Sequence, residues 1–120
     1  MYKVMIVDDE PIIVEGLSRS IAWEKWNCKV AATAHDGLEG KKIIEEIHPD
    51  IVFMDICMPE MDGLEASRAI RDIDPEIPII ALTANAFDSD KQKAIDAGCN
   101  DYMAKPIVVG QLTAMIKKYI

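Results

Sequence analysis

Five side chains at the ends of short apolar runs have the chemical types needed for phosphoryl transfer. They are Asp8, Asp9, Asp55, Thr83 and Lys105. An aspartate carboxylate can attack phosphorus and form an aspartyl phosphate, and such a transfer depends mainly on positioning and on neutralising charge. Lys105 would hold the phosphoryl oxygens by its charge, and Thr83 would hold them by a hydrogen bond. A compact ammonium on a flexible stem suits this role better than an arginine.

The carboxylates of Asp8, Asp9 and Asp55 would repel one another if they met without a counterion. A hard cation resolves this repulsion, and carboxylate oxygens together with water suit Mg²⁺, with Mn²⁺ as the alternative. The cation would also neutralise an incoming phosphoryl group. We therefore expect a divalent cation where these three side chains converge.

Each of these residues also has an ordinary structural interpretation. A single aspartate after a strand is usually a helix cap or a turn residue, and Asp9 or Glu10 alone would favour the positive start of a following helix. Thr83 alone is more often a turn residue, and Lys105 alone is more often a solvated surface lysine. Independent capping does not predict compatible groups at the ends of four strands, so their coincidence favours one shared site.

The apolar runs have the length and composition of strands buried in a parallel sheet. Uninterrupted apolar runs are typical of strands that are covered on both faces. A weaker run at 28–34 predicts a strand nearer the sheet edge. The five strands are expected at residues 4–7, 28–34, 51–54, 79–82 and 101–104. The five side chains would then gather at the carboxyl ends of the strands, where open parallel sheets carry their functional groups.

Helical signals fill the segments between these runs. The five helices are expected to begin near Pro11, Asp36, Asp62, Asp88 and Val108. Proline suits a first helical turn, and aspartate followed three residues later by glutamate is a capping pattern. Five strands alternating with five helices predict an α/β fold, a doubly wound parallel sheet with helices on both faces and right-handed crossovers.

Size and composition predict one domain, residues 1–120. Half of the 120 residues are hydrophobic, which is enough for one core. A net charge of −8 with 13 scattered basic residues argues against nucleic-acid binding by this domain. No apolar stretch approaches the ~20 residues of a membrane span, and the first residues lack a signal-peptide pattern. Three cysteines without metal spacing fit reduced thiols, so we expect a cytoplasmic location and no membrane partner.

The motifs around the five side chains resemble those of the receiver domains of bacterial two-component response regulators. The matching segments are residues 7–11 (VDDEP), 54–63 (MDICMPEMDG), 81–84 (ALTA) and 101–106 (DYMAKP). The resemblance runs from residue 3 to about residue 118. It implies a flavodoxin-like fold with strand order 2-1-3-4-5, and a signalling switch rather than an enzyme with separate substrate turnover.

The resemblance also implies the chemistry of the site. Asp55 would take a phosphoryl group from a histidine of a sensor histidine kinase or a phosphotransfer protein. Asp8, Asp9 and Asp55, together with the backbone carbonyl of Cys57, would bind Mg²⁺. The histidine donor and the role of the Cys57 carbonyl rest on the resemblance alone, because neither spacing nor composition establishes them.

A switching mechanism is implied in the same way. Thr83 would be the switch hydroxyl, Lys105 the phosphate-sensing amine and Tyr102 the aromatic rotamer switch. A cis peptide, which is essentially a proline-specific option, would join Lys105 to Pro106. The face made by the fourth helix, fifth strand and fifth helix would then change its partners, which are an output domain, a partner protein or a second copy in a phosphorylation-dependent homodimer.

Two features leave the phosphoryl lifetime and the parent protein open. Cys57 and Asn85 stand two residues after Asp55 and Thr83, where the family tunes how long the phosphoryl group lasts, and both are uncharged. Residues 21–24 resemble regulators with helix-turn-helix output domains, whereas residues 80–87 resemble receivers of hybrid histidine kinases. A stand-alone regulator is the third architecture that fits.

Three other function classes are compatible with the same fold. A non-phosphorylated interaction module would be expected to have lost part of the acidic set, which is complete here. A flavin or nucleotide carrier would need a phosphate-cradling loop after the first strand, where residues 8–10 would repel phosphate. A phosphatase with an aspartate nucleophile would need a second carboxylate two residues after Asp55, and Cys57 stands there.

Overall fold

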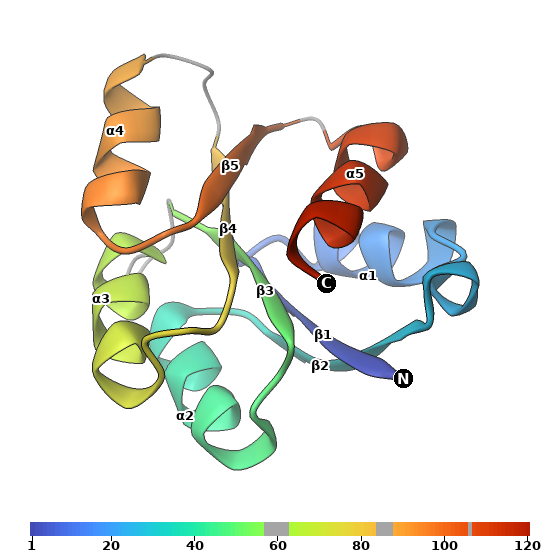
Figure 1. Cartoon of the computed structure of the whole chain (residues 1–120), viewed down its shortest axis with the longest axis horizontal. Coiled ribbons are helices and arrows are strands. Elements are labelled where there is room, and N and C mark those ends of the chain that lie inside the picture. Colours follow the sequence, from blue (N-terminus) through green and yellow to red (C-terminus); the bar gives the residue numbers. More distant parts are fainter. Residues whose placement is uncertain (57–62, 84–87, 106) are drawn as a thin grey trace.

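A computed structural model of the chain shows a five-stranded parallel sheet between two layers of helices (Figure 1). The structure describes residues 1–56, 63–83, 88–105 and 107–120. The strands are β1 (Tyr2–Val7), β2 (Cys28–Ala34), β3 (Ile51–Asp55), β4 (Ile79–Thr83) and β5 (Asp101–Ala104). They lie in the order β2-β1-β3-β4-β5, which confirms the predicted flavodoxin-like topology.

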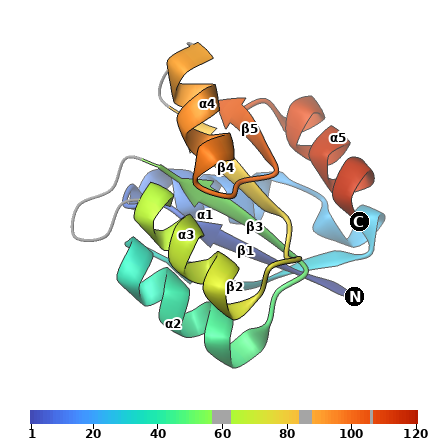
Figure 2. The same ribbon diagram turned by 60° about the vertical axis from the view of Figure 1, so that its left-hand side comes forward.

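Five α-helices and one short 3-10 helix connect the strands. They are α1 (Pro11–Ser20), η1 (Trp23–Trp26), α2 (Gly37–Ile47), α3 (Gly63–Ile73), α4 (Asp88–Asp96) and α5 (Val109–Tyr119). Helices α1 and α5 cover one face of the sheet, and α2, α3 and α4 cover the other (Figures 1 and 2). In this doubly wound arrangement the carboxyl ends of the strands lie between the two helix layers.

Alternate strand residues supply the two halves of the core. Val4 and Ile6 belong to the cluster that packs under α1 and α5, whereas Met5 and Val7 belong to the cluster under α2, α3 and α4. All four side chains are fully buried. Burial on both faces explains why the strands read as uninterrupted apolar runs in the sequence.

Local signals set several helix ends, and the predicted cap at Asp36 is confirmed. The Asp36 side chain accepts a hydrogen bond from the Glu39 backbone N–H at 2.8 Å and caps α2. His48, at φ 47°, ends the same helix in the left-handed conformation. Gly98 follows α4 with φ +100°, and a Cβ there would lie 2.7 Å from Arg71 Cγ, so both backbone conformation and space favour glycine. The predicted cap at Asp62 lies outside the described residues.

The sheet differs from the predicted one at its β2 edge. Strand β1 begins at Tyr2, two residues earlier than expected, because Tyr2 pairs with Cys28 at the start of β2. The register between these strands shifts after Val4, and the shift leaves Ala31 as an extra residue in β2. Sequence periodicity carries no signal for such a bulge.

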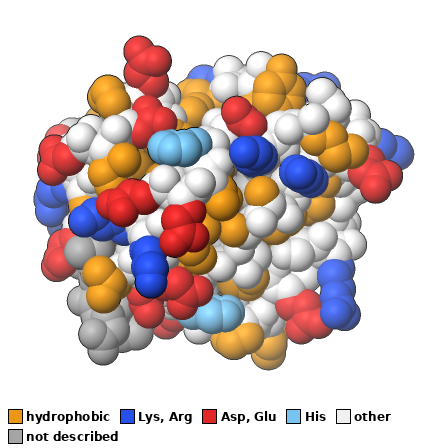
Figure 3. Space-filling model, turned by 90° about the horizontal axis from the view of Figure 1, so that it is seen from below, with side chains coloured by type: hydrophobic (Ala, Val, Ile, Leu, Met, Phe, Trp, Pro, Cys, Tyr) orange, Lys and Arg blue, Asp and Glu red, His pale blue; other side chains and the backbone are white. Residues whose placement is uncertain are grey.

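The surface seen from below mixes acidic, basic and apolar side chains, and no continuous basic patch crosses this face (Figure 3). That distribution agrees with the scattered basic residues of the sequence. None of the helices in the described part of the chain combines the length and the apolarity that crossing a membrane requires.

Candidate functional site

The carboxyl edge of the sheet brings together the residues that follow the central strands. Asp8 follows β1, and its backbone N–H donates to the Ala34 carbonyl at 3.1 Å, so the chain holds this position against the end of β2. Asp55 is the last residue of β3. The Lys105 backbone N–H donates to the Thr83 carbonyl at 2.8 Å, which holds Lys105 beside the end of β4.

Three carboxylates form a compact acidic cluster at this edge. Asp8, Asp9 and Asp55 each offer a carboxylate oxygen, and these oxygens all lie within 4.8 Å of one another. Asp8 is 0% exposed and Asp55 is 3% exposed, whereas Asp9 is nearer the solvent. Two buried carboxylates at such separations repel each other strongly unless a positive charge lies between them.

Lys105 supplies a positive charge to this cluster. Its Nζ lies 2.9 Å from Asp8 Oδ2, 3.3 Å from Asp55 Oδ2 and 3.5 Å from Glu10 Oε1. The contact with Asp55 has hydrogen-bond geometry. Burial lowers the pKa of Lys105, but the contact with Asp8 and the charge of Asp55 outweigh it, so the pKa lies above its ordinary value. Lys105 therefore stays protonated and acts as an internal counterion.

One buried oxygen of the cluster keeps free hydrogen-bonding capacity. Asp8 Oδ1 accepts a hydrogen bond from the Glu10 backbone N–H at 2.9 Å. Asp8 Oδ2 is buried and accepts no hydrogen bond from the residues that the structure describes, although Lys105 Nζ lies close to it. The contact between Lys105 Nζ and Asp8 Oδ2, at 2.9 Å, is an ion pair. A buried carboxylate oxygen without a donor is costly unless a cation binds it.

The residues present fit a hard divalent cation. The three aspartates provide carboxylate oxygens at one point, which Mg²⁺ prefers, and Asp8 Oδ2 has capacity for a further ligand bond. With four acidic side chains, Asp8, Asp9, Asp55 and Glu10, around one ammonium, the edge has a net negative charge. A bound cation would supply the missing positive charge and would neutralise negative oxygens next to Asp55.

The predicted switch residues lie on the adjacent strands. Thr83, the last residue of β4, is fully buried, and its hydroxyl donates to the Met103 carbonyl at 3.5 Å. Tyr102 is half-buried in β5 and packs against the core cluster under α2, α3 and α4. Lys91 of α4 places its Nζ 4.7 Å from the centre of the Tyr102 ring, a cation–π distance.

Comparison with known proteins decides the family. Residues 4–117 match the family model of the response regulator receiver domain. The chain belongs to that family. The response regulator MprA of Mycobacterium ulcerans (strain Agy99) is 34% identical over 115 residues, which cover 96% of this chain and 48% of MprA. The chain thus spans about half the length of this curated relative.

Solved structures of receiver domains share the fold. The REC domain of AraT, a response regulator from Geobacillus stearothermophilus, is 36% identical with a TM-score of 0.89, and the match covers 98% of this chain and 92% of that one. A chain in the co-crystal structure of the Saccharomyces cerevisiae histidine phosphotransfer signaling protein Ypd1 with the receiver domain of its downstream response regulator Ssk1 is 31% identical. Its TM-score is 0.88, with coverage of 98% and 88%.

Membership of the response regulator receiver family places this domain in two-component signalling. Receiver domains are signalling switches that pair with histidine kinases or phosphotransfer proteins, and they generally bind Mg²⁺ at an acidic pocket. The acidic cluster of Asp8, Asp9 and Asp55 has the carboxylate composition of such a pocket. The family therefore favours a switch over the flavin carrier and the phosphatase that also fitted the fold.

Three predicted positions lie outside the described residues. They are the backbone carbonyl of Cys57, the residue Asn85 and the cis peptide before Pro106. Their roles stay predictions. The structure does bring together Asp8, Asp9, Asp55 and Lys105, and it places Thr83 at the end of the neighbouring strand.

Two contacts of the site residues are not predicted by the sequence. The sequence indicates Glu10 only as an acid at a helix start, yet its carboxylate reaches Lys105. Lys91 has no predicted role, yet it lies over the Tyr102 ring. The position of Glu10 just after the acidic pair is the available signal for the first contact, whereas nothing in the sequence pairs Lys91 with Tyr102.

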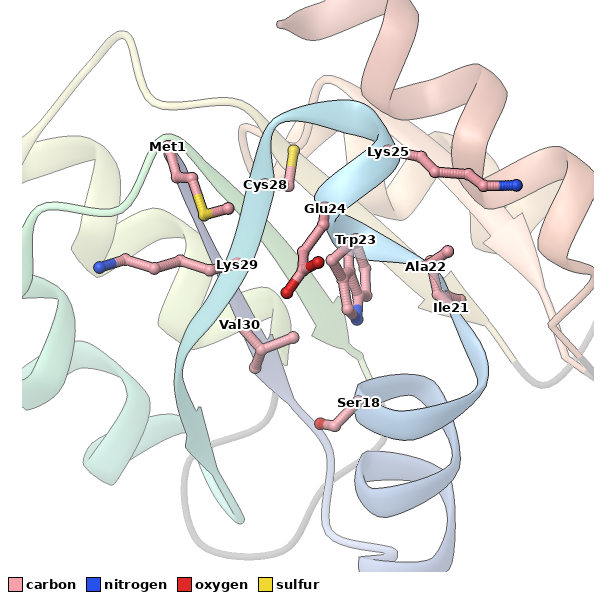
Figure 4. Close-up of a pocket in the computed structure, with 10 residues that line it drawn as sticks. All are labelled: Met1, Ser18, Ile21, Ala22, Trp23, Glu24, Lys25, Cys28, Lys29 and Val30. Atoms are coloured by element: carbon pink, nitrogen blue, oxygen red, sulfur yellow. The ribbon is translucent and has the colours of Figure 1, made fainter.

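A cavity of the receiver domain lies away from the acidic cluster. It has a volume of about 510 Å³ and is lined by the end of α1, by η1 and by the start of β2, including Trp23, Cys28 and Met1 (Figure 4). Met1 precedes β1 and Asp8 follows it, so the cavity and the cluster lie at opposite ends of the parallel strands. The charged groups at the carboxyl edge, and not this cavity, therefore identify the site.

Proposed function

We propose that Asp55 accepts a phosphoryl group in a two-component phosphorelay. One carboxylate oxygen of Asp55 would attack phosphorus while the bond from phosphorus to the donor histidine nitrogen breaks. The released imidazole nitrogen keeps the electron pair of that bond and takes up a proton. The observation that carries the proposal is the position of Asp55 at the end of β3, within the acidic cluster and 3.3 Å from Lys105 Nζ.

The neighbouring residues have separate roles in this proposal. Asp8, Asp9 and Asp55, with the Cys57 carbonyl, would hold Mg²⁺ or Mn²⁺, which supplies charge neutralisation when bound. Lys105 would pair with a phosphoryl oxygen by charge, and its raised pKa keeps it protonated for that purpose. The Thr83 hydroxyl donates to the Met103 carbonyl at a long 3.5 Å, and it would exchange this bond for one to a phosphoryl oxygen.

Phosphorylation would then change the surface formed by α4, β5 and α5. The modification adds about −1.5 to −2 charge at pH 7, which would attract Thr83 and Lys105 and leave room for Tyr102 to turn inward. Tyr102 now lines a surface concavity with Lys91, Gln111 and Met115, between α4 and α5. An inward turn would reshape that concavity, and the change is a shift between two populated states.

The partners follow from the family and remain part of the proposal. The donor would be a sensor histidine kinase or a phosphotransfer protein, in the cytoplasm, and the domain would catalyse only its own phosphorylation and dephosphorylation. Residues 1–120 would form one receiver domain that does not itself bind nucleic acid. An output domain, a partner protein or a phosphorylation-dependent homodimer would read the altered surface.

Phosphorylation of Asp55 can be tested with a small-molecule donor. Acetyl phosphate or phosphoramidate with Mg²⁺ should add the mass of one phosphoryl group to the intact protein, and Asp55→Asn should abolish the addition. Asp96→Asn is the matched control, because Asp96 is an exposed aspartate on α4 that pairs with Gln92, and it should be labelled like the wild type. Labelling that persists in Asp55→Asn would refute the assignment.

A Mg²⁺ titration separates a working receiver from a non-phosphorylated interaction module. NMR is the suitable readout, because Trp23 and Trp26 lie at the other end of the sheet from the acidic cluster and their fluorescence would respond weakly. Saturable shifts of the amides of Asp8, Asp9 and Asp55 are expected. A module without a working pocket would show none.

A further inference from the structure

Glu10 is a partner of Lys105 that does not belong to the acidic cluster. Its Oε1 lies 3.5 Å from Lys105 Nζ, and its side chain is 60% exposed, whereas the side chains of Asp8 and Asp55 are 0% and 4% exposed. The carboxylate oxygens that meet within 4.8 Å come from Asp8, Asp9 and Asp55 alone among the described residues. Lys105 therefore contacts two cluster acids on its buried side and Glu10 on its solvent side.

The backbone of Glu10 is fixed in this position. Its N–H donates to Asp8 Oδ1 at 2.9 Å, and its carbonyl accepts from the N–H groups of Ile13 and Val14 at 3.1 and 3.2 Å. Glu10 is thus the N-cap residue of α1. The side chain extends from an anchored point next to the pocket, so reaching Lys105 costs less ordering than it would from a loop.

Lys105 and a bound cation would compete for the same oxygens. In the structure Nζ lies against Asp8 Oδ2 and Asp55 Oδ2, and both residues belong to the set that fits a divalent cation. Two positive charges repel at such distances. When a cation enters, the ammonium must give up at least part of these contacts, and a partner outside the cation site lowers the cost of doing so.

We propose that Glu10 is a positioning residue that retains Lys105 at the mouth of the pocket when a divalent cation occupies the aspartates. The proposal rests on the proposed function, because it assumes that the acidic cluster binds Mg²⁺. Glu10 would ease the displacement of the ammonium from Asp8 and Asp55. It would also keep the ammonium beside the pocket, where the oxygens of an incoming phosphoryl group must arrive.

A double-mutant cycle with Glu10→Gln and Lys105→Ala tests the proposal. Mg²⁺ alone is titrated into the wild type, both single variants and the double variant, and the dissociation constant is measured from amide shifts. Glu10→Gln should weaken Mg²⁺ binding by about 1.4- to 5-fold, the range expected for an exposed ion pair. In the Lys105→Ala background the same substitution should have a clearly smaller effect.

Glu15→Gln is the matched control. It removes the same charge from the same helix, where Glu15 pairs only with the exposed Arg19 at 2.9 Å among the residues that the structure describes, and it should leave Mg²⁺ affinity unchanged. The Lys105 side-chain ¹H–¹³Cε signal of the Mg²⁺-saturated protein should shift in Glu10→Gln and stay in place in Glu15→Gln. A purely structural role of Glu10 would not move this signal.

Two results would overturn the proposal. An equal weakening by Glu10→Gln with and without Lys105 would mean that Glu10 acts only through its own charge on the cation. Unchanged Mg²⁺ binding in Glu10→Gln would mean that Lys105 needs no partner outside the cation site. Failure of the proposed function is distinct from both, because the wild type itself would then show no saturable response to Mg²⁺.

Discussion

Two basic side chains, one at each end of the sheet, are surrounded by different acceptors. Lys105 at the carboxyl edge faces the carboxylates of Asp8, Asp55 and Glu10. Arg71, at the end of α3 and the amino edge of the sheet, donates to neutral groups instead. Its acceptors are the carbonyls of Gly98 at 2.8 Å, Ile77 at 2.6 Å and Asp74 at 3.3 Å, and the side chain of Asn100.

The contrast separates a structural network from a functional one. Around Arg71, the guanidinium donors and the neutral acceptors pair with one another. Asn100 Oδ1 also accepts a hydrogen bond from the Ile79 N–H at 2.9 Å, which links β4 to the segment before β5. Burial lowers the pKa of Arg71, and no bound ion is needed there. Around Lys105, acids outnumber the base and Asp8 Oδ2 lacks a donor among the described residues. That end of the molecule is completed by what it binds.

The largest effect we expect is at the amino edge. Arg71→Met should lower the free energy of unfolding by about 3 kcal/mol, because it leaves several partly buried carbonyls without donors. Arg71→Lys should lower the free energy of unfolding by less, because lysine keeps the positive charge, although it lacks the planar set of guanidinium donors. Urea unfolding measures both. Mg²⁺ affinity should not change, and a parallel loss of affinity would contradict the separation of the two networks.

Neutralising an acid at the carboxyl edge should raise the free energy of unfolding instead of lowering it. Asp8→Asn should raise the free energy of unfolding without Mg²⁺ by about 1 kcal/mol, because it removes repulsion from Asp9 and Asp55, while the amide oxygen still accepts the Glu10 N–H. In the wild type, Mg²⁺ at 100 times its dissociation constant should add about 2.7 kcal/mol, and EDTA should reverse this gain.

Asp8→Asn should lose most of that Mg²⁺-dependent gain. Thermal melts with Mg²⁺ and with EDTA provide the measurement. A variant that is less stable than the wild type in EDTA would show that the Asp8–Lys105 ion pair outweighs the repulsion among the aspartates.

The smallest effects should appear in the pH dependence of the free energy of unfolding, as one loss of stability at acid pH and one at alkaline pH. For Asp101 near the amino edge, burial favours a higher pKa, but hydrogen bonds from the Tyr102 N–H, Lys118 and Tyr119 outweigh it and lower the pKa. Its stabilisation is therefore present above the ordinary pKa and is lost as pH falls through the lowered one. The raised pKa of Lys105 means that its stabilisation is fully present below the ordinary pKa of about 10.4 and is lost as pH rises through the raised one.

Stability measured against pH distinguishes these two contributions. Asp101→Asn should flatten the acid limb below about pH 4. It should also reduce the alkaline limb, because Asp101 raises the pKa of Lys118 and, together with burial, the pKa of Tyr119. Lys105→Ala should reduce the alkaline limb independently, and a non-additive result in the double variant would show that the two ends are coupled.

The sequence predicted the fold and most of the acidic edge because those features are local. The length of each apolar run predicted a buried strand, and the residue after the run then had to lie at the carboxyl edge. Asp8, Asp55 and Lys105 could be placed together on that ground alone. The start of α2 at Asp36 also follows from a local sequence pattern, and the structure confirms it.

The contacts that depend on long side chains could not be predicted. Arg71 has the sequence signature of an exposed basic residue in the last turn of a helix, and only the path of the chain from Asp74 to Ile77 makes its carbonyl acceptors available. Glu10 and Lys105 are far apart in sequence, and their contact depends on the direction of two flexible side chains. Neither direction is encoded in periodicity.

The extra residue in β2 has a consequence for how copies of this protein meet. Strand β2 is an outer strand of the sheet, and its free N–H and C=O groups would be a template for a further strand from another molecule. The bulge at Ala31 interrupts the spacing of those groups. The opposite outer strand, β5, has only four residues. Neither border of the sheet therefore presents a long regular ladder, which protects the protein against edge-to-edge aggregation.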